Sequence, residues 1–364
     1  MLTKEQWTRY NRQVILPQIG VEGQKRLLDS RVLVIGAGGL GAPVLAYLTS
    51  AGVGTIGIVD ADAVEMSNLQ RQIIHSEYSI GRQKTSSAIG FLSQLNSEIC
   101  INEHPVFLSP ENAKDIIGEY DLIINGTDNF PTRYLVNDCC VLLQKPLIDA
   151  SVLKFDGQAT VFLPGEGCYR CLYPSIPSRS IIKNCSENGV IGPLVGMMGS
   201  LQAVEALKVL LRIGNPLSGK LIMFDSFNGE FNSIKWSKNP KCPLCGDNPT
   251  ITDLSDDYGI NCETKQIDYS DEWDLDLETL NNMRPFPDII DLRDNVEFHG
   301  KLPLHNSKII SFEEVLIQFE SWDRERLIVF ICDIGIRSSA LTEMLRSKGF
   351  KLVYHLRGGI SHWL

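Results

Sequence analysis

One stretch of this chain, residues 31–72, constrains the fold more than any other. It holds two apolar runs, Val32–Ile35 and Thr55–Val59, and the glycine-rich turn GAGGLG (residues 36–41) follows the first run. Helix-like spacing fills residues 43–51, and Asp60 closes the second run. A strand, a glycine turn, a helix and a second strand that ends in an acid are typical of a nucleotide-binding α/β unit.

Each part of this unit has a physical role. The first glycine permits a tight turn, the second lets the backbone approach a phosphate, and the third allows the helix to pack closely on the strand. Asp60 can accept a hydrogen bond from a ribose hydroxyl. The unit therefore predicts an adenine nucleotide and leaves NAD and ATP both open. Its candidate nucleotide-binding residues are Gly36, Gly38, Gly39, Gly41 and Asp60.

The rest of the chain indicates two α/β domains. Strand-like and helix-like segments alternate to about residue 150, and the last helix-like segment spans residues 135–143. The alternation predicts a doubly wound sheet with its ligand at the carboxyl ends of the strands. Hairpin-like strands then flank an apolar helix at residues 193–211, which we expect to be buried. A chain of 364 residues exceeds one ordinary core. We predict a first domain at 1–246, an acidic linker at 247–263 and a smaller α/β domain at 264–364.

Composition excludes several function classes. The net charge of -10 at pH 7 argues against a nucleic-acid binder. We expect that no apolar run approaches the roughly 18–20 residues that a membrane span needs, and the polar N-terminus has no signal-peptide core. The chain is therefore expected in the cytoplasm. In that reducing compartment, the ten cysteines are expected to be metal ligands or reactive thiols rather than disulfides.

Charged residues beyond Asp60 indicate what is done to the nucleotide. Chemistry at an α-phosphate needs cations for the growing charge and a carboxylate for magnesium, whereas hydride transfer needs little of either. Arg71, Lys84 and Asp128 supply that set near strand ends. Each alone could be a surface charge. Together they favour nucleotidyl transfer over an NAD-dependent oxidoreductase.

Two CxxC pairs form the strongest purely chemical signal in the sequence. Four thiolates make a complete tetrahedral zinc shell with no open position for water, so the predicted zinc is structural. Buried or redox-active cysteines are the alternative. The four ligands are Cys168, Cys171, Cys242 and Cys245.

Two other cysteines have surroundings that suit reactivity. Cys185 lies in a polar loop close to Lys183 and ahead of the long apolar helix, and both features can lower a thiol pKa. Cys332 ends an apolar strand, and the loop to Arg337 and the next helix can turn backbone N–H groups onto an anionic sulfur. The alternative is that neither is reactive: Cys185 would then be an incidental loop residue, and Cys332 would only cap a buried strand.

Several separated motifs resemble the MoeB/ThiF family over about residues 2–246. They are RYNRQ at residues 9–13, the glycine turn, DADAVEMSNLQRQ at 60–72 and GTDN at 126–129. The resemblance implies an E1-like enzyme that uses ATP to adenylate the C-terminal Gly-Gly of a ubiquitin-like sulfur-carrier protein.

Residue roles follow from that resemblance by position. Asp60, Ser67 and Asn68 would hold the nucleotide with the glycine turn. Arg71 and Lys84 would hold its phosphates and Asp128 would bind magnesium. The resemblance also implies that Arg12 reaches the ATP site of a second subunit in a homodimer. Cys185 would correspond to the family's mobile-loop cysteine, which can link covalently to the carrier.

The motifs IIDLRD, CDIGIRS and LRGGISHW resemble a single rhodanese domain over about residues 264–364. That resemblance implies a persulfide on Cys332, supplied by a donor such as a cysteine desulfurase. Four residues separate Cys332 from Arg337, a smaller cradle than the five-residue spacing of related phosphatases. Asp333 departs from the pattern and, if it pointed inward, would raise the thiol pKa.

The sequence therefore predicts an adenylyltransferase that also transfers sulfur and leaves a thiocarboxylate on its carrier. It does not choose the carrier, and molybdopterin, thiamine and thiolated tRNA are all possible destinations of the sulfur. Two rival hypotheses stay open. One is an NAD-dependent oxidoreductase, and the other is a non-catalytic scaffold for a carrier and a sulfur donor.

Overall fold

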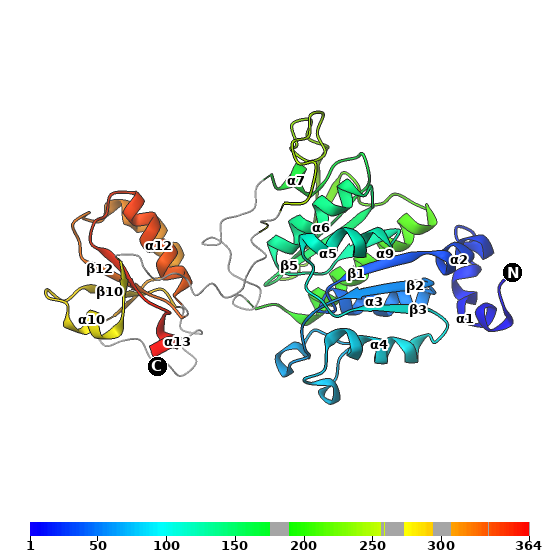
Figure 1. Ribbon diagram of the computed structural model, residues 1–364, viewed down its shortest axis with the longest axis horizontal. Helices are drawn as coiled ribbons and strands as arrows, with labels where there is room; N and C mark the ends of the chain where they lie inside the picture. The colour runs from blue at the N-terminus through cyan, green and yellow to red at the C-terminus, as the bar shows by residue number, and fades with distance from the viewer. Residues whose placement is uncertain (175–188, 256–257, 259–272, 294–306, 334, 364) are drawn as a thin grey trace. The chain divides into compact units, whose positions relative to one another are not determined.

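The computed structural model describes residues 1–174, 189–255, 258, 273–293, 307–333 and 335–363 (Figure 1). The chain divides into two compact units, with the boundary near residue 261. The three-part division at residues 246 and 263 stays a prediction. Each unit is an α/β structure and is described by itself.

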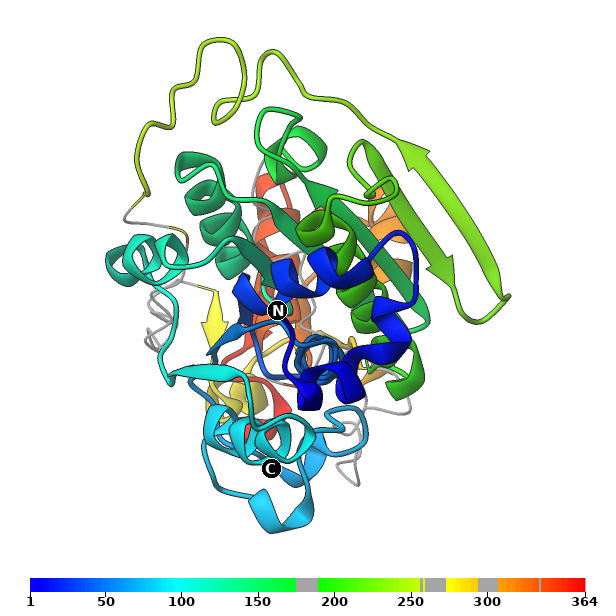
Figure 2. The ribbon, with the colours of Figure 1, turned by 90° about the vertical axis from the view of Figure 1, so that its right-hand side faces the viewer.

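The described part of the first unit contains an eight-stranded sheet of order β3-β2-β1-β4-β5-β6-β7-β8. The first five strands in that order, β3, β2, β1, β4 and β5, are parallel to one another. The strands β6, β7 and β8 add antiparallel pairings at one edge. The β7–β8 hairpin forms the outer edge in Figure 2. The bounds are β1 Arg31–Ile35, β2 Thr55–Val59, β3 Cys100–His104, β4 Leu122–Asn125, β5 Leu147–Leu153, β6 Asp156–Phe162, β7 Lys220–Asp225 and β8 Glu230–Lys235.

Helices cover both faces of this sheet. α3, α4 and α9 share one apolar core with alternate residues of the central strands, while α5 and α6 share the other. In Figure 1, α4 lies on the opposite side of the strands from α5 and α6. The bounds are α1 Lys4–Val14, α2 Gly20–Asp29, α3 Gly41–Ala51, α4 Lys84–Leu95, α5 Pro110–Gly118, α6 Phe130–Leu142, α7 Tyr169–Leu172 and α9 Gly192–Leu211, with 3₁₀ turns at η1 Met66–Asn68 and η2 Glu77–Ser79. The predicted Rossmann-like sheet is confirmed.

The start of α6 corrects the sequence reading, which places the helix at residues 135–143. The helix begins at Phe130 because the Asn129 side chain accepts a hydrogen bond from the N–H of Thr132 (2.9 Å). A side-chain oxygen at this cap satisfies an N–H group that the helix itself cannot. Pro131 is tolerated in the first turn, where its missing N–H costs nothing. The cap places Asp128 directly before a helix N-terminus.

α9 is the one helix in the described residues that is long and apolar enough, by length and composition, to cross a membrane. The expectation that no apolar run reaches that length is therefore wrong. The helix packs against α3, β5 and β6, and half of its apolar window is buried. Its buried Glu205 accepts hydrogen bonds from the Leu217 N–H (2.8 Å) and from Lys208 Nζ (2.5 Å). These features are those of a core helix, although the expectation of full burial holds for only one face.

The segment after residue 246, which reads as a solvated linker, is in part packed on the first unit. Leu254 and the buried Tyr258 belong to the core around α6. The Tyr258 hydroxyl donates to Asp138 Oδ2 (2.8 Å), and Lys114 pairs with Asp253. Within the described residues, Asp253, Leu254 and Tyr258 therefore contact this unit.

The described part of the second unit contains a five-stranded parallel sheet of order β11-β10-β12-β13-β9. Residues of α11 and α12 pack on one face, and residues of α10 and α13 pack on the other. The bounds are β9 Asp274–Leu275, α10 Leu277–Asn282, β10 Asp288–Asp291, β11 Lys308–Ile309, α11 Phe312–Gln318, η4 Phe319–Ser321, β12 Ile328–Ile331, α12 Ile336–Ser347, β13 Val353–Leu356 and α13 Ile360–Trp363. The strands β9 and β11 and the helices α10 and α13 are each too short to give a periodic pattern in the sequence.

Candidate functional site

The glycine turn between β1 and α3 is closed by its backbone. Gly36 has φ +97°, a left-handed value that favours glycine, and its N–H donates to the carbonyl of Val59 (2.8 Å). A Cβ at Gly41 would lie 1.9 Å from the Gly36 carbonyl oxygen, so only glycine allows the helix to begin there. The N–H groups of Gly38 and Gly39 have no acceptor among the described residues. They are free to bind an anion.

Asp60 follows β2 and lies beside this turn. The N–H of Ala37 donates to Asp60 Oδ2 (2.8 Å), and the N–H of Asp62 donates to Oδ1 (2.9 Å). Burial raises the pKa of Asp60, whereas the charge of Lys84 and the two backbone bonds lower it. Each carboxylate oxygen keeps lone-pair capacity for another donor.

Lys84 begins α4 and has a buried side chain. Its Nζ lies 2.7 Å from Asp62 Oδ2 and 4.0 Å from Asp60 Oδ1. The structure thus brings Lys84 to the acid at the end of β2. In this conformation the ammonium group is paired with carboxylates, and a phosphate group would compete with Asp62 for it.

The segment around η1 carries Ser67, Asn68 and Arg71. The Asn68 side chain is buried and accepts from the Glu65 N–H (3.1 Å), whereas Ser67 is exposed and donates to Glu65 Oε2 (3.2 Å). Arg71 Nη1 donates to the Ser67 carbonyl (3.2 Å). A Cβ at Gly39 would lie 3.4 Å from Arg71 Cγ, so the stem of Arg71 lies against the glycine turn.

Asp128 belongs to the loop that follows β4. This loop abuts the glycine turn, because a Cβ at Gly36 would lie 3.0 Å from the Gly126 carbonyl oxygen. Asp128 is exposed and makes no hydrogen bond or ion pair within the described ranges of the chain. The glycine turn, Asp60 and Asp128 all lie at the carboxyl ends of neighbouring parallel strands, where ligands of such sheets bind.

Sequence reasoning missed an ion pair beneath this loop. Arg133 of α6 and Asp149 of β5 are both buried, with Arg133 Nη1 2.6 Å from Asp149 Oδ2. Arg133 Nη2 also donates to the Thr127 carbonyl (2.8 Å), next to Asp128. Burial raises the pKa of Asp149, and the Arg133 charge lowers it in opposition. In the sequence, the only indication of this pair is that Arg133 interrupts the apolar pattern of a helix.

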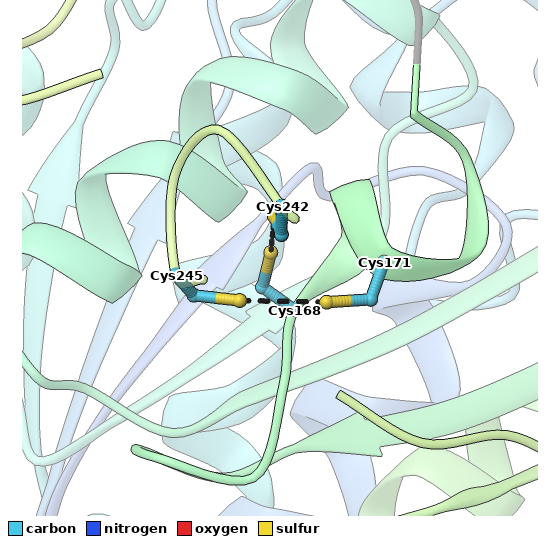
Figure 3. A group of neighbouring side chains, drawn as sticks. All are labelled: Cys168, Cys171, Cys242 and Cys245. Atoms are coloured by element: carbon cyan, nitrogen blue, oxygen red, sulfur yellow. Dashed lines mark hydrogen bonds between the residues drawn. The ribbon is translucent and has the colours of Figure 1, made fainter. Parts of the chain in front are cut away.

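The four CxxC cysteines form one cluster (Figure 3). Cys168 and Cys171 lie at α7, and Cys242 and Cys245 lie on a loop after β8. Their sulfur atoms all lie within 4.8 Å of one another, with Cys168 and Cys242 3.7 Å apart and Cys171 and Cys245 3.4 Å apart. A tetrahedron with Zn–S bonds of about 2.3 Å places its sulfurs about 3.8 Å apart, so the cluster fits zinc.

Two further observations support a cation at this cluster. The N–H of Asn239 donates to Cys171 Sγ (3.3 Å), as expected for a ligand with thiolate character. The hydrogen bond between the Cys168 and Cys171 thiols lowers the pKa of Cys171 and raises that of Cys168. Four thiolates at this spacing repel one another, and a bound cation removes that repulsion.

The second unit places Cys332 at the end of β12 and the start of α12 just beyond it. Cys332 is buried, and its Sγ accepts from the N–H of Ser338 (3.5 Å) and lies 3.4 Å from Ser338 Oγ. Arg337 is half-buried and donates to the Leu292 carbonyl (3.3 Å). The loop packs on the glycine pair that follows β13, since a Cβ at Gly359 would lie 2.4 Å from the Asp333 carbonyl oxygen.

Two predicted residues are not brought to these groups. Cys185 lies outside the described residues. Arg12 is exposed in the last turn of α1, and no described residue of this chain accepts a hydrogen bond from it. The roles predicted for all the candidate residues stay predictions.

The family is decided by comparison with known proteins. The model of the ThiF family matches residues 10–244. The chain belongs to the ThiF family. A rhodanese-like domain matches residues 276–364 of this ThiF-family chain, so both resemblances noted in the sequence are confirmed.

The relatives of this ThiF-family chain include proteins that span it entirely. It is 50% identical over 260 residues to "Sulfur carrier protein adenylyltransferase" of Thermus thermophilus, covering 70% of this chain and 96% of that protein. It is 38% identical to "Adenylyltransferase and sulfurtransferase MOCS3-2" of Zea mays, covering 98% and 78%. It is 39% identical to "Adenylyltransferase and sulfurtransferase MOCS3" of Drosophila sechellia, covering 100% and 84%. The predicted enzyme class agrees with these names.

Solved structures similar to this ThiF-family chain include MccB of E. coli. The structure with succinimide has a TM-score of 0.59 at 27% identity and covers 67% of this chain and 75% of MccB. The structure with ATP has a TM-score of 0.56 at 27% identity and covers 65% and 74%.

Proposed function

We propose that the first unit uses ATP to adenylate the C-terminal glycine of a ubiquitin-like sulfur-carrier protein, and that the second unit supplies the sulfur. The observation that carries the proposal is the grouping at one sheet edge. The glycine turn, Asp60 with the nearby Lys84 ammonium, and Asp128 follow the carboxyl ends of neighbouring parallel strands. Within the described residues, the N–H groups of Gly38 and Gly39 and the Asp128 carboxylate have no partner. A site that only bound NAD would need neither the Lys84 ammonium nor the Asp128 carboxylate.

The nucleotide would be held by the backbone and by carboxylate oxygens. Asp60 keeps lone pairs for the ribose hydroxyls, and the free N–H groups of Gly38 and Gly39 would face phosphate oxygens. Ser67 and Asn68 line the adjoining segment. Arg71, whose stem lies on Gly39, would bind phosphate together with Lys84.

Asp128 fits the role of a magnesium ligand. Mg²⁺ prefers oxygen ligands and commonly takes one or two carboxylates together with substrate phosphates. Asp128 offers one exposed, unpaired carboxylate within the part of the chain that is described. Magnesium bound there would neutralise charge on the phosphates of ATP.

The reaction consists of alignment and charge neutralisation. The carrier's terminal carboxylate is already a nucleophile, so attack on the α-phosphorus requires no general base. Pyrophosphate leaves and an acyl-adenylate forms. The positive charges of Arg71 and Lys84 act where negative charge grows in the transition state.

Sulfur would come from a persulfide on Cys332. The Ser338 N–H and the start of α12 direct positive dipoles at its sulfur, and Arg337 adds a cation at the same loop. We propose a cysteine desulfurase as the persulfide donor and Cys185 as the residue that holds the carrier covalently, as a thioester formed when its thiolate displaces AMP. The outer sulfur of the Cys332 persulfide would then attack the acyl carbon and displace the Cys185 thiolate, which gives an acyl disulfide. Two equivalents of a thiol reductant would cleave its S–S bond, release the thiocarboxylate and return Cys332 to the thiol. The thiocarboxylate would serve molybdopterin or thiamine synthesis or another sulfur-containing product.

The assembly and location are part of the same proposal. We propose a cytoplasmic homodimer in which Arg12 of one subunit reaches the ATP site of the other. The exposed position of Arg12 supports this role. The cysteine cluster would hold a structural zinc that joins the segment after β6 to the loop after β8.

Pyrophosphate exchange tests this function. The chain, ATP, Mg²⁺, a carrier ending in Gly-Gly and labelled pyrophosphate should give labelled ATP, and Asp128→Ala should abolish the label. With a persulfide donor and a thiol reductant, the carrier should gain about 16 Da, the exchange of oxygen for sulfur. An NAD-dependent oxidoreductase would give no exchange. If the chain were only a scaffold that recruits the carrier and the sulfur donor, the Asp128→Ala substitution would leave thiocarboxylate formation unchanged.

A further inference from the structure

We propose that the buried Arg133–Asp149 ion pair is a positioning device for Asp128. The pair holds Thr127, the residue before Asp128, and so fixes the carboxylate that takes the divalent cation. The inference rests on the proposed function, because it assigns a support to the magnesium ligand named there.

One side of Thr127 is held by the arginine. Arg133 Nη2 donates to the Thr127 carbonyl (2.8 Å) and to the Ala150 carbonyl (3.1 Å). Arg133 Nη1 donates to both oxygens of Asp149, at 2.8 and 2.6 Å. Because the peptide bond is planar, holding the Thr127 carbonyl also fixes the direction of the Asp128 N–H.

The other side of Thr127 is held by Asn125, the last residue of β4. Asn125 Oδ1 accepts from the Thr127 hydroxyl (2.7 Å) and from the Thr127 N–H (3.3 Å). Asn125 Nδ2 donates to Asp149 Oδ1 (2.7 Å), which orients the amide. The same aspartate therefore organises both groups that hold Thr127. On the far side of Asp128, the Asn129 cap fixes the start of α6.

This network explains how Asp128 is held in position. Asp128 is exposed and without a partner among residues that are described, so its own side chain contributes nothing to its position. Its placement depends on the backbone on either side. A buried ion pair is a weak source of stability because desolvation offsets the attraction, whereas it defines geometry through its many hydrogen bonds. Replacing residues that orient a metal ligand by hydrogen bonds commonly changes the affinity for the metal.

The chain contains a matched control on the same helix. Asp138 of α6 is buried and accepts two hydrogen bonds from Arg170, at 2.7 and 2.6 Å. Like Arg133–Asp149, the pair joins an arginine to a buried aspartate through two short hydrogen bonds, although Arg170 is only half-buried. Its hydrogen bonds do not reach the Asp128 loop. Arg133→Lys and Arg170→Lys each keep the charge and lose the planar set of donors.

The test measures the effect of Mg²⁺ on nucleotide affinity in the full chain. Titration calorimetry gives the Kd of an ATP analogue with a methylene group between its α- and β-phosphates, with and without Mg²⁺. Wild type should show a gain in affinity with Mg²⁺, and Asp128→Asn should lose it. Arg133→Lys should reduce the gain by about tenfold or more, while Arg170→Lys keeps it. Thermal midpoints and zinc contents of both lysine variants are measured alongside.

The outcomes separate this inference from the proposed function. If wild type shows no gain, or Asp128→Asn keeps it, the magnesium role of Asp128 fails. If Asp128→Asn loses the gain and Arg133→Lys keeps it, the positioning role fails and the first proposal stands. If both lysine variants lose the gain equally, the effect is general destabilisation, and the positioning role is likewise rejected.

Discussion

The ammonium group of Lys84 lies 2.7 Å from the Asp62 carboxylate, at the end of the strand that carries Asp60. The lysine side chain is buried, whereas Asp62 is largely exposed. Lys84 is therefore held at the proposed nucleotide site by an acid whose side chain is exposed to solvent. A phosphate group arriving at the site can take the place of Asp62 with little change in the position of the cation.

Replacing Lys84 should remove adenylation and leave the fold intact. We expect Lys84→Met to lower ATP–pyrophosphate exchange by about 100-fold, because one preorganised donor to transition-state charge has that typical value. The control is Lys208→Met, which removes a lysine paired with the buried Glu205 in α9. Lys208→Met should exchange at the wild-type rate. Exchange by Lys84→Met within about twofold of wild type would contradict the role of Lys84.

The four-cysteine cluster should contain zinc. Atomic emission of the purified chain should find about one zinc per chain, since four thiolates complete the shell. Cys242→Ser should lose the metal and unfold at a lower temperature, because binding free energy of a structural metal is folding free energy. Cys139→Ser, at a buried cysteine outside the cluster, is the control and should keep its zinc. A normal zinc content in Cys242→Ser would disprove the assignment.

The features that could be predicted from the sequence are those carried by neighbouring residues. The glycine turn, Asp60 and the CxxC pairs are local patterns, and their shape follows from backbone geometry and from ligand spacing. The Arg133–Asp149 pair joins two elements, and no periodicity predicts which buried arginine meets which acid. The burial of Tyr258 could not be predicted either. Its acidic neighbours in the sequence indicate a solvent-exposed segment, whereas its ring packs in the core around α6.

The hydroxyl of Tyr258 should stabilise the first unit. It donates to the buried carboxylate of Asp138, and hydrogen bonds to charged groups contribute about 1.5–3 kcal/mol. We expect Tyr258→Phe to lower the free energy of unfolding of this unit by that amount in urea. Tyr47→Phe removes an exposed hydroxyl and should change nothing. Equal stabilities of the two variants would mean that the segment around Tyr258 is a solvated linker after all.

Cysteine substitutions should separate the two activities. Cys332→Ala should stop thiocarboxylate formation and leave pyrophosphate exchange unchanged, because Cys332 lies in the second unit and adenylation uses residues of the first. Cys100→Ala removes an exposed thiol on β3 and should affect neither reaction. Mass spectrometry of the carrier and the exchange assay measure the two outcomes. Thiocarboxylate formed by Cys332→Ala at the wild-type rate would show that another thiol carries the sulfur.

His75 should make the first unit sensitive to acid. Its Nε2 donates to the Ala37 carbonyl (3.0 Å) in the glycine turn, and Nδ1 lies 2.8 Å from the Ser87 hydroxyl, which donates to it when the ring is neutral. Burial lowers the pKa of His75, and the charge of Lys84 adds to that effect. As pH falls through the ordinary histidine pKa of about 6.5, the unfolded chain takes up a proton that the folded chain does not.

Stability must then fall with pH by at most about 1.4 kcal/mol per pH unit for this group. The loss begins near the pKa of the unfolded histidine and ends once the folded ring is also protonated. His75→Gln keeps an N–H donor for the Ala37 carbonyl and cannot titrate. We expect the urea midpoint of His75→Gln to vary less between about pH 7 and pH 5 than that of wild type. Parallel pH profiles would show that His75 titrates alike in the folded and unfolded chain.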